Sequence, residues 1–269
     1  MKLHKLAVLC AVLLLAAGSC GCKKLKARDQ LNKGVGAFRN AQFQTAIMHF
    51  KNAVVLDPTL LNARLYLATA YGQQYIPGGE SAENLKVAQQ AIEAFEDVLK
   101  VDPNNTTAIA SIAQMYYNMK KFDRAKEYQQ RRLQVEPNNP EPYYWVGVLD
   151  WAICFPRTQQ FRKDLNLEFP KDPKDPNTLP PIPEKARVEL ETQNGPLVAE
   201  GIDALQKAIQ LKPNDFDTMA YLNLLYRQKA DIEKDPEARA ADLQQAEDWV
   251  NKALAVKKAA AERAASAAR

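Results

Sequence analysis

The side chains most capable of chemistry in this chain are its thiols and imidazoles, and most of them crowd the amino-terminal end. The chain has four cysteines and two histidines, and only one of each lies beyond residue 22. A structural metal site or a disulfide framework needs further ligands at set spacings. A catalytic Ser–His or Cys–His pair in the body of the chain would depend on a single histidine. The residues concerned are Cys10, Cys20, Cys22, Cys154, His4 and His49.

Other signatures of catalysis are also missing from the sequence. No H-E-x-x-H, Walker-type or G-x-S-x-G pattern occurs, and these patterns supply zinc ligands, a phosphate cradle and an activated serine, respectively. The net charge of +4 includes two lysines at the amino terminus and is too small to suggest nucleic-acid binding. We therefore expect no enzyme activity, no cofactor, no metal, no nucleic-acid partner and no small-molecule substrate.

Residues 1–19 have the pattern of a secretion signal. Lys2 and Lys5 precede an apolar run from Leu6 to Ala17, which is shorter than the roughly 20 residues of a membrane-spanning helix. The run ends in Ala17-Gly18-Ser19-Cys20, which resembles the cleavage motif of bacterial lipoproteins. The resemblance implies that Cys20 becomes the mature amino terminus and carries acyl chains such as palmitate. Two or more such chains give stable membrane attachment.

Alternatives to lipidation at Cys20 remain open at this stage. Ser19-Cys20-Gly21-Cys22 is a poorer second register for lipidation, at Cys22. Cleavage by ordinary signal peptidase would release a soluble periplasmic protein, and a C-x-C metal or redox pair is a third interpretation. The absence of an acidic residue at Gly21 favours the outer membrane over the inner membrane, by resemblance to enterobacterial sorting. Residues 20–26 would then form the anchor and a short linker.

The body of the chain carries an internal repeat. An apolar helix end followed by a charged residue and proline recurs four times, and two of these prolines are 34 residues apart. This spacing and the small residues that accompany it resemble the tetratricopeptide repeat, a helix–turn–helix unit. The resemblance implies an all-α solenoid of about five repeats over residues 27–258, in which small residues let the two helices of a unit approach closely. The repeated prolines are Pro58, Pro103, Pro137 and Pro213, and the small residues include Gly34, Gly147 and Gly201.

Longer spacings in the repeat predict insertions near residues 73–83, 155–196 and 228–243. The insertion at 155–196 is rich in proline, and its centre, FPKDPKDPNTLPPIPEK, is incompatible with a helix. It could be a disordered excursion, an ordered loop packed across the concave face of the array, or a proline-rich ligand for another protein. Residues 259–269 form an Ala-rich basic tail that we expect to be a fraying helix.

The resemblance also predicts where a partner would bind, because tetratricopeptide arrays line their concave groove with fixed positions of the first helix of each unit. Aromatic rings and amides at these positions suit an extended or helical peptide. Packing of the proline-rich insertion onto Tyr144 and Trp151 within the chain is the alternative. The predicted partner-binding residues are Phe38, Arg39, Gln114, Tyr117, Asn118, Tyr144, Trp151 and Arg227. The groove positions of the five units, in chain order, are as follows: Arg28, Leu31, Val35, Phe38 and Arg39; Asn62, Leu65, Thr69, Gly72 and Gln73; Thr107, Ala110, Gln114, Tyr117 and Asn118; Glu141, Tyr144, Val148, Trp151 and Ala152; and Asp217, Ala220, Leu224, Arg227 and Gln228.

The sequence thus predicts a lipid-anchored scaffold for protein–protein interactions in the bacterial cell envelope, attached to the periplasmic face of a membrane. Two alternatives are a soluble periplasmic binding protein and a non-catalytic subunit of an envelope enzyme or of a secretion or pilus assembly. The partner protein is not identified by the sequence.

Mass spectrometry of the mature amino terminus tests the anchor. We expect an acylated Cys20 in the native chain and in a Cys22→Ala variant, and loss of the acyl mass in Cys20→Ala. An unmodified residue following Ser19 would contradict lipidation.

Overall fold

The computed structural model describes residues 22–170, 172 and 179–267. The predicted signal over residues 1–19 and the predicted acylation site at Cys20 lie outside the described residues. The chain divides into two compact units, unit 1 up to Lys121 and unit 2 from Phe122, and each is described by itself below.

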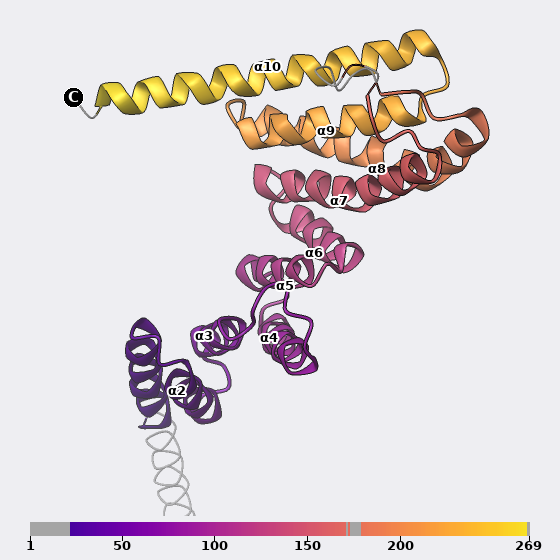
Figure 1. Cartoon of the computed structure of the whole chain (residues 1–269). Coiled ribbons are helices and arrows are strands. Elements are labelled where there is room, and N and C mark those ends of the chain that lie inside the picture. The colour runs from indigo at the N-terminus through magenta and orange to yellow at the C-terminus, as the bar shows by residue number, and fades with distance from the viewer. Residues whose placement is uncertain (1–21, 171, 173–178, 268–269) are drawn as a thin grey trace, which may run out of the picture. The chain divides into compact units, whose positions relative to one another are not determined.

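Both units are built from helices, most of which are joined by short turns (Figure 1), whereas a longer segment connects α7 to α8. Unit 1 contains a helix whose described part covers residues 22–39, followed by α2 (Phe43–Leu56), α3 (Leu61–Gly72), α4 (Ala82–Val101) and α5 (Thr106–Asn118). Unit 2 contains α6 (Phe122–Val135), α7 (Pro140–Asp164), α8 (Glu184–Leu211), α9 (Phe216–Ile232) and α10 (Pro236–Ala267). The predicted all-α fold of successive helix–turn–helix units is confirmed.

The repeated prolines act as the sequence predicts. The helices α2, α4, α6 and α8 each end two residues before one of them, because proline lacks the N–H and disfavours helical geometry in the residue before it. Asparagine side chains start two of the helices that follow, α5 and α7. The Asn105 side chain accepts a hydrogen bond from the Ala108 N–H at 3.0 Å, and the Asn139 side chain accepts one from the Glu141 N–H at 3.0 Å, which satisfies donors that the helix leaves free.

The predicted close approach of paired helices is present at three glycines. A Cβ atom on Gly34 would lie 2.4 Å from the ring of Phe50, and one on Gly147 would lie 2.3 Å from Leu205 Cγ. A Cβ on Gly201 would lie 2.7 Å from Leu225. Any larger residue at these positions would therefore force the facing side chain, or the helix that carries it, to shift.

The stretches predicted as insertions at 155–196 and 228–243 are helical over part of their length. The helix α7 continues to Asp164 through Pro156, α8 begins at Glu184 and passes through Pro196, and only residues 233–235 separate α9 from α10. The lengthened helices bury new contacts, which offset the lost backbone hydrogen bonds. For example, the buried Asn194 amide donates to the Cys154 carbonyl and to the Thr158 hydroxyl, both at 3.2 Å. The insertion at 73–83 does form a connection between α3 and α4.

The remaining proline-rich segment, residues 165–183, is held at its described ends by arginines. Arg162, which is fully buried, forms an ion pair with Asp231 and donates to the carbonyls of Leu167 at 3.2 Å and Pro180 at 3.1 Å. Arg239 donates to the Leu179 carbonyl at 3.0 Å. These ends are thus attached to α7 and α10 of unit 2.

The tail, expected to be a helix, is helical through Ala267, whereas the expectation at the amino-terminal end changes. Residues 22–26, predicted as part of a linker, are helical, and α10 continues without interruption to Ala267. Within the described ranges, no helix combines the length and apolarity needed to cross a membrane.

A matched pair of substitutions in one helix tests the glycine packing. Gly34→Ala should destabilise unit 1 by about 1–3 kcal/mol, because the new methyl group overlaps the Phe50 ring. Gly36→Ala, where a Cβ meets no atom within 4 Å, should stabilise it by about 0.5–1 kcal/mol through helix propensity. Hydrogen-exchange mass spectrometry of peptides from residues 43–56 measures both, with unit 2 peptides as the internal reference. Equal effects of the two variants would contradict the packing argument.

Candidate peptide-binding face

The exposed side of α5 coincides with the predicted groove positions. The opposite side buries Ala108, Ile109, Ile112, Ala113, Met115 and Tyr116. Gln114 is exposed, and Tyr117 and Asn118 are half-buried on the same side of the helix, as residues three and four apart must be. The Gln114 amide donates to Asn118 Oδ1 at 2.9 Å, so these two amides present a joined polar surface.

The first helix and α3 also leave their predicted groove positions uncovered. Phe38 is half-buried, packs against the unit 1 core and meets the Phe43 ring edge-on at 5.5 Å. Arg39 beside it is exposed. The helix α3 is linked to α5 through Tyr75, whose hydroxyl donates to the Asn118 carbonyl at 3.2 Å. None of the fifteen predicted positions in unit 1 is buried, and we call this set the unit 1 face.

The corresponding positions in unit 2 are partly closed. Val148 and Gln228 are buried, at 2% and 5% exposure. The rings of Tyr144 and Trp151 meet Tyr221 of α9 edge-on at 5.7 and 5.6 Å. The ring that packs against both of these aromatics is therefore Tyr221 of α9. Trp151 is also stacked on Phe155 of its own helix, with ring centroids 5.0 Å apart.

The last predicted residue, Arg227, is attached to its neighbours. Its Nε donates to Asn223 Oδ1 at 2.9 Å, and its Nη2 lies 3.6 Å from Glu247 Oε2 of α10. Tyr144 does reach a hollow of about 210 Å³ near the starts of α7 and α9. The carboxylates of Glu141 and Asp217 also line this hollow.

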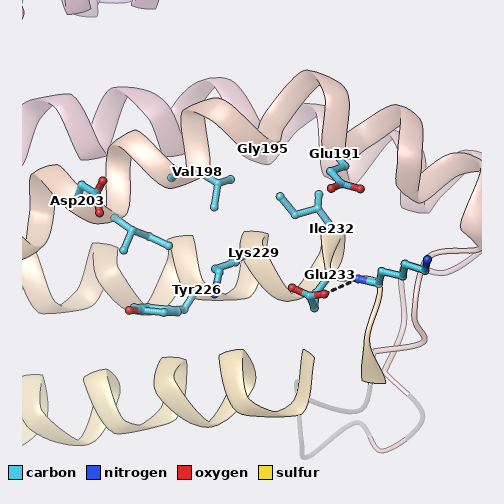
Figure 2. Close-up of a pocket in the computed structure, with 11 residues that line it drawn as sticks. Glu191, Gly195, Val198, Asp203, Tyr226, Lys229, Ile232 and Glu233 are labelled. Carbon is cyan, nitrogen blue, oxygen red and sulfur yellow. Dashed lines mark hydrogen bonds between the residues drawn. The ribbon is translucent and has the colours of Figure 1, made fainter. Parts of the chain in front are cut away.

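A groove between α8 and α9, with a volume of about 350 Å³, escaped the sequence analysis (Figure 2). Its apolar lining includes Val198, Ile202 and Ile232, which have the pattern of core residues in sequence. Two of its charged residues have partners, because Lys229 contacts Asp242 at 2.6 Å and Glu191 contacts Arg187 at 2.9 Å. None of the predicted groove residues lines it. Its extent depends on the lengthening of α8 and α9, which the sequence did not indicate.

A buried ionic cluster joins three helices of unit 2. Lys126 Nζ of α6 lies 2.5 Å from Asp150 Oδ1 of α7 and 2.7 Å from Glu200 Oε2 of α8. Asp150 is fully buried. Burial raises the pKa of its carboxyl to about 7, although the hydrogen bond from Lys126 acts in the opposite direction.

Cys154 lies one helical turn further along α7 and is free and buried. Burial raises its pKa to about 12, so the thiol remains protonated and unreactive near neutral pH. Among the described residues, no group of His, Cys, Asp and Glu side chains is placed to hold a metal ion.

Comparison with known proteins places these helices in the tetratricopeptide fold. The family description "Tetratricopeptide repeat" matches residues 87–145. The Hsp70-Hsp90 organizing protein 3 of Arabidopsis thaliana is 28% identical over 43% of this chain, and the mitochondrial import receptor subunit TOM70 of Homo sapiens is 25% identical over 67%. These alignments span 19% and 28% of the two relatives' own lengths.

Solved structures agree over most of the chain. MamA from Desulfovibrio magneticus RS-1 has a TM-score of 0.54 at 16% identity and covers 87% of this chain and 96% of its own. YrrB, described as a TPR protein with an unusual peptide-binding site, has a TM-score of 0.50 at 14% identity and covers 85% of this chain and 90% of its own. The predicted solenoid fold is thus confirmed, and likeness at this identity establishes the fold alone.

The raised pKa of Asp150 predicts a pH dependence of unit 2. Between the ordinary value of 3.8 and about 7, the folded chain holds a proton that the unfolded chain has lost. The contribution of Asp150 protonation to the stability of unit 2 is therefore complete below a pH of 3.8 and is lost as the pH rises through about 7. The loss amounts to at most about 1.4 kcal/mol per pH unit.

Urea unfolding at pH 5 and pH 8 measures this effect. All three tryptophans, Trp145, Trp151 and Trp249, lie in unit 2, so their fluorescence reports on that unit. The native chain should lose more stability from pH 5 to pH 8 than Asp150→Asn, which cannot titrate. An unchanged pH dependence in the variant would contradict the assignment.

Proposed function

We propose that this chain is a non-catalytic scaffold that binds a peptide segment of a partner protein on the unit 1 face. We propose further that acyl chains on Cys20 hold it in the bacterial cell envelope, at the periplasmic side of the outer membrane. The first part is supported by the described residues, and the second by the sequence pattern of residues 1–20.

One observation carries the choice of unit 1. All fifteen of its predicted groove positions retain exposure, whereas Val148 and Gln228 of unit 2 are buried and Tyr144 and Trp151 pack against Tyr221. A ring already packed against a neighbouring helix gives up those contacts if it turns toward a ligand. On the unit 1 face, Arg39 is exposed, and Gln114 would give up only its exposed hydrogen bond to Asn118.

The chemistry of the unit 1 face suits a peptide backbone. Its amides, among them Gln114 and Asn118, can donate to and accept from backbone groups. Tyr117 offers a large amphipathic surface at little entropic cost. The only charged residues in the set are Arg28 and Arg39, so a segment with net positive charge is disfavoured.

The comparisons are consistent with a peptide ligand. YrrB has the same fold and its description includes a peptide-binding site. An organizing protein and an import receptor subunit are among the relatives in sequence. The alternatives are a soluble periplasmic binding protein, if the anchor is absent, and a non-catalytic subunit of an envelope enzyme or of a secretion or pilus assembly.

Quantitative capture of partners from envelope fractions tests the binding face. The variant Arg39→Glu/Gln114→Ala/Tyr117→Ala should lower recovery of specific partners at least about tenfold, since a few central residues dominate such interfaces. The matched control Leu85→Ala/Lys86→Glu/Gln90→Ala changes exposed residues of α4 and should leave recovery unchanged. Circular dichroism verifies that both variants are folded. Equal recovery with all three proteins would contradict the assignment.

A further inference from the structure

The first described turns of the chain form a strongly basic surface. Lys23, Lys24, Lys26 and Arg28 are all exposed on the helix that covers residues 22–39. None of the four forms an ion pair with another described residue within the distance of a salt bridge. Lys33 further along is matched by Asp29 at 2.7 Å, so the excess of positive charge is concentrated in residues 23–28.

Two of these cations, Lys24 and Arg28, act on the Asp57 carboxylate, which lies beyond this helix. Its pKa is held below the ordinary value chiefly by a hydrogen bond from the Thr59 hydroxyl, and further by the charges of Lys24 and Arg28. Asp57 is hydrogen-bonded within the turn that follows α2, because the Thr59 hydroxyl and backbone N–H both donate to its Oδ1. The neighbouring acid therefore leaves most of the positive charge uncompensated.

An apolar side chain lies within this basic surface. Leu25 is 71% exposed and is flanked in sequence by Lys24 and Lys26, while the buried side of the same turn is occupied by Ala27. An exposed leucine between lysines has the chemistry of a segment that enters the boundary between lipid headgroups and acyl chains. The apolar group inserts there, and the long lysine side chains reach back to the phosphates.

We propose that residues 23–28 bind the surface of an anionic phospholipid bilayer. The proposal rests on the proposed anchor for its location, because Leu25 is five residues from Cys20 and thus at most about 18 Å from the acylated residue. The helix extends through residue 22, so little slack separates the anchor from unit 1. Basic residues beside an anchored chain strengthen attachment through the negative surface potential, and this contact would hold the first helix at the membrane.

Vesicle binding by the chain without its acyl groups tests the contact separately from the anchor. The protein is residues 20–269 with Cys20→Ala and Cys22→Ala, which retains all the contacts described above. It should sediment with vesicles containing phosphatidylglycerol and not with pure phosphatidylcholine. Added salt should weaken the binding, because exposed charges are screened.

Substitutions locate the contact. Lys23→Gln/Lys24→Gln/Lys26→Gln should weaken binding to the anionic vesicles at least about tenfold. The control Lys86→Gln/Lys163→Gln/Lys207→Gln removes the same charge from exposed sites elsewhere and should have little effect. At high salt, where the charges are screened and the apolar contribution remains, Leu25→Ser should bind the anionic vesicles more weakly than the protein with Leu25 intact.

Three results would overturn the proposal: equal binding to neutral vesicles, equal loss in the two triple variants, or binding to a soluble polyanion such as heparin without binding to vesicles. Partner recovery on the unit 1 face is measured independently, with Lys23, Lys24 and Lys26 intact. Failure of the lipid contact would therefore leave the proposed scaffold function standing, and failure of the scaffold function would leave the lipid contact standing.

Discussion

The close contact between helices at Gly34, Gly147 and Gly201 is the constraint on which the rest of the structure depends. At each of these glycines a Cβ atom would lie within 2.7 Å of a side chain on the facing helix, closer than atoms pack in a protein interior. Helices held this close bury the side that faces the neighbouring helix. The opposite side is then not needed for packing. The helix α5 likewise has a buried side, and its uncovered residues lie on the opposite side.

Unit 2 uses the same constraint and adds longer helices. Lengthening α7 and α8 brings buried polar groups together, and the helices are joined by ion pairs such as Lys126 with Glu200 and Arg162 with Asp231. Breaking one member of such a pair leaves a buried charge uncompensated. In unit 2, the predicted groove aromatics Tyr144 and Trp151 are therefore used for packing between helices. We infer from this that partner binding falls to unit 1.

The fold followed from the sequence because its signals are local. Each of the four repeated prolines follows the end of a helix, and the small residues at a fixed register lie where helices are in contact. Parts of the stretch predicted as an insertion at 155–196 are helical, because a proline inside a helix removes one backbone hydrogen bond and tertiary contacts at residues such as Asn194 can offset that loss. The residues of the predicted groove could be named from register alone. Burial of Val148 and Gln228, and the groove between α8 and α9, could not, since both depend on how far helices extend and which rings they bring together.

The central claim is that partners bind the uncovered side of α5, and site-specific photocrosslinking measures this most directly. A photoreactive side chain placed at Gln114 in the full chain, in its native envelope, should crosslink to a discrete partner protein, and the same group at Gln90 of α4 should not. Loss of the Gln114 crosslink in an Arg39→Glu background would link the two predicted parts of the face. A partner that crosslinks equally from both positions, or only from the groove between α8 and α9, would contradict the account.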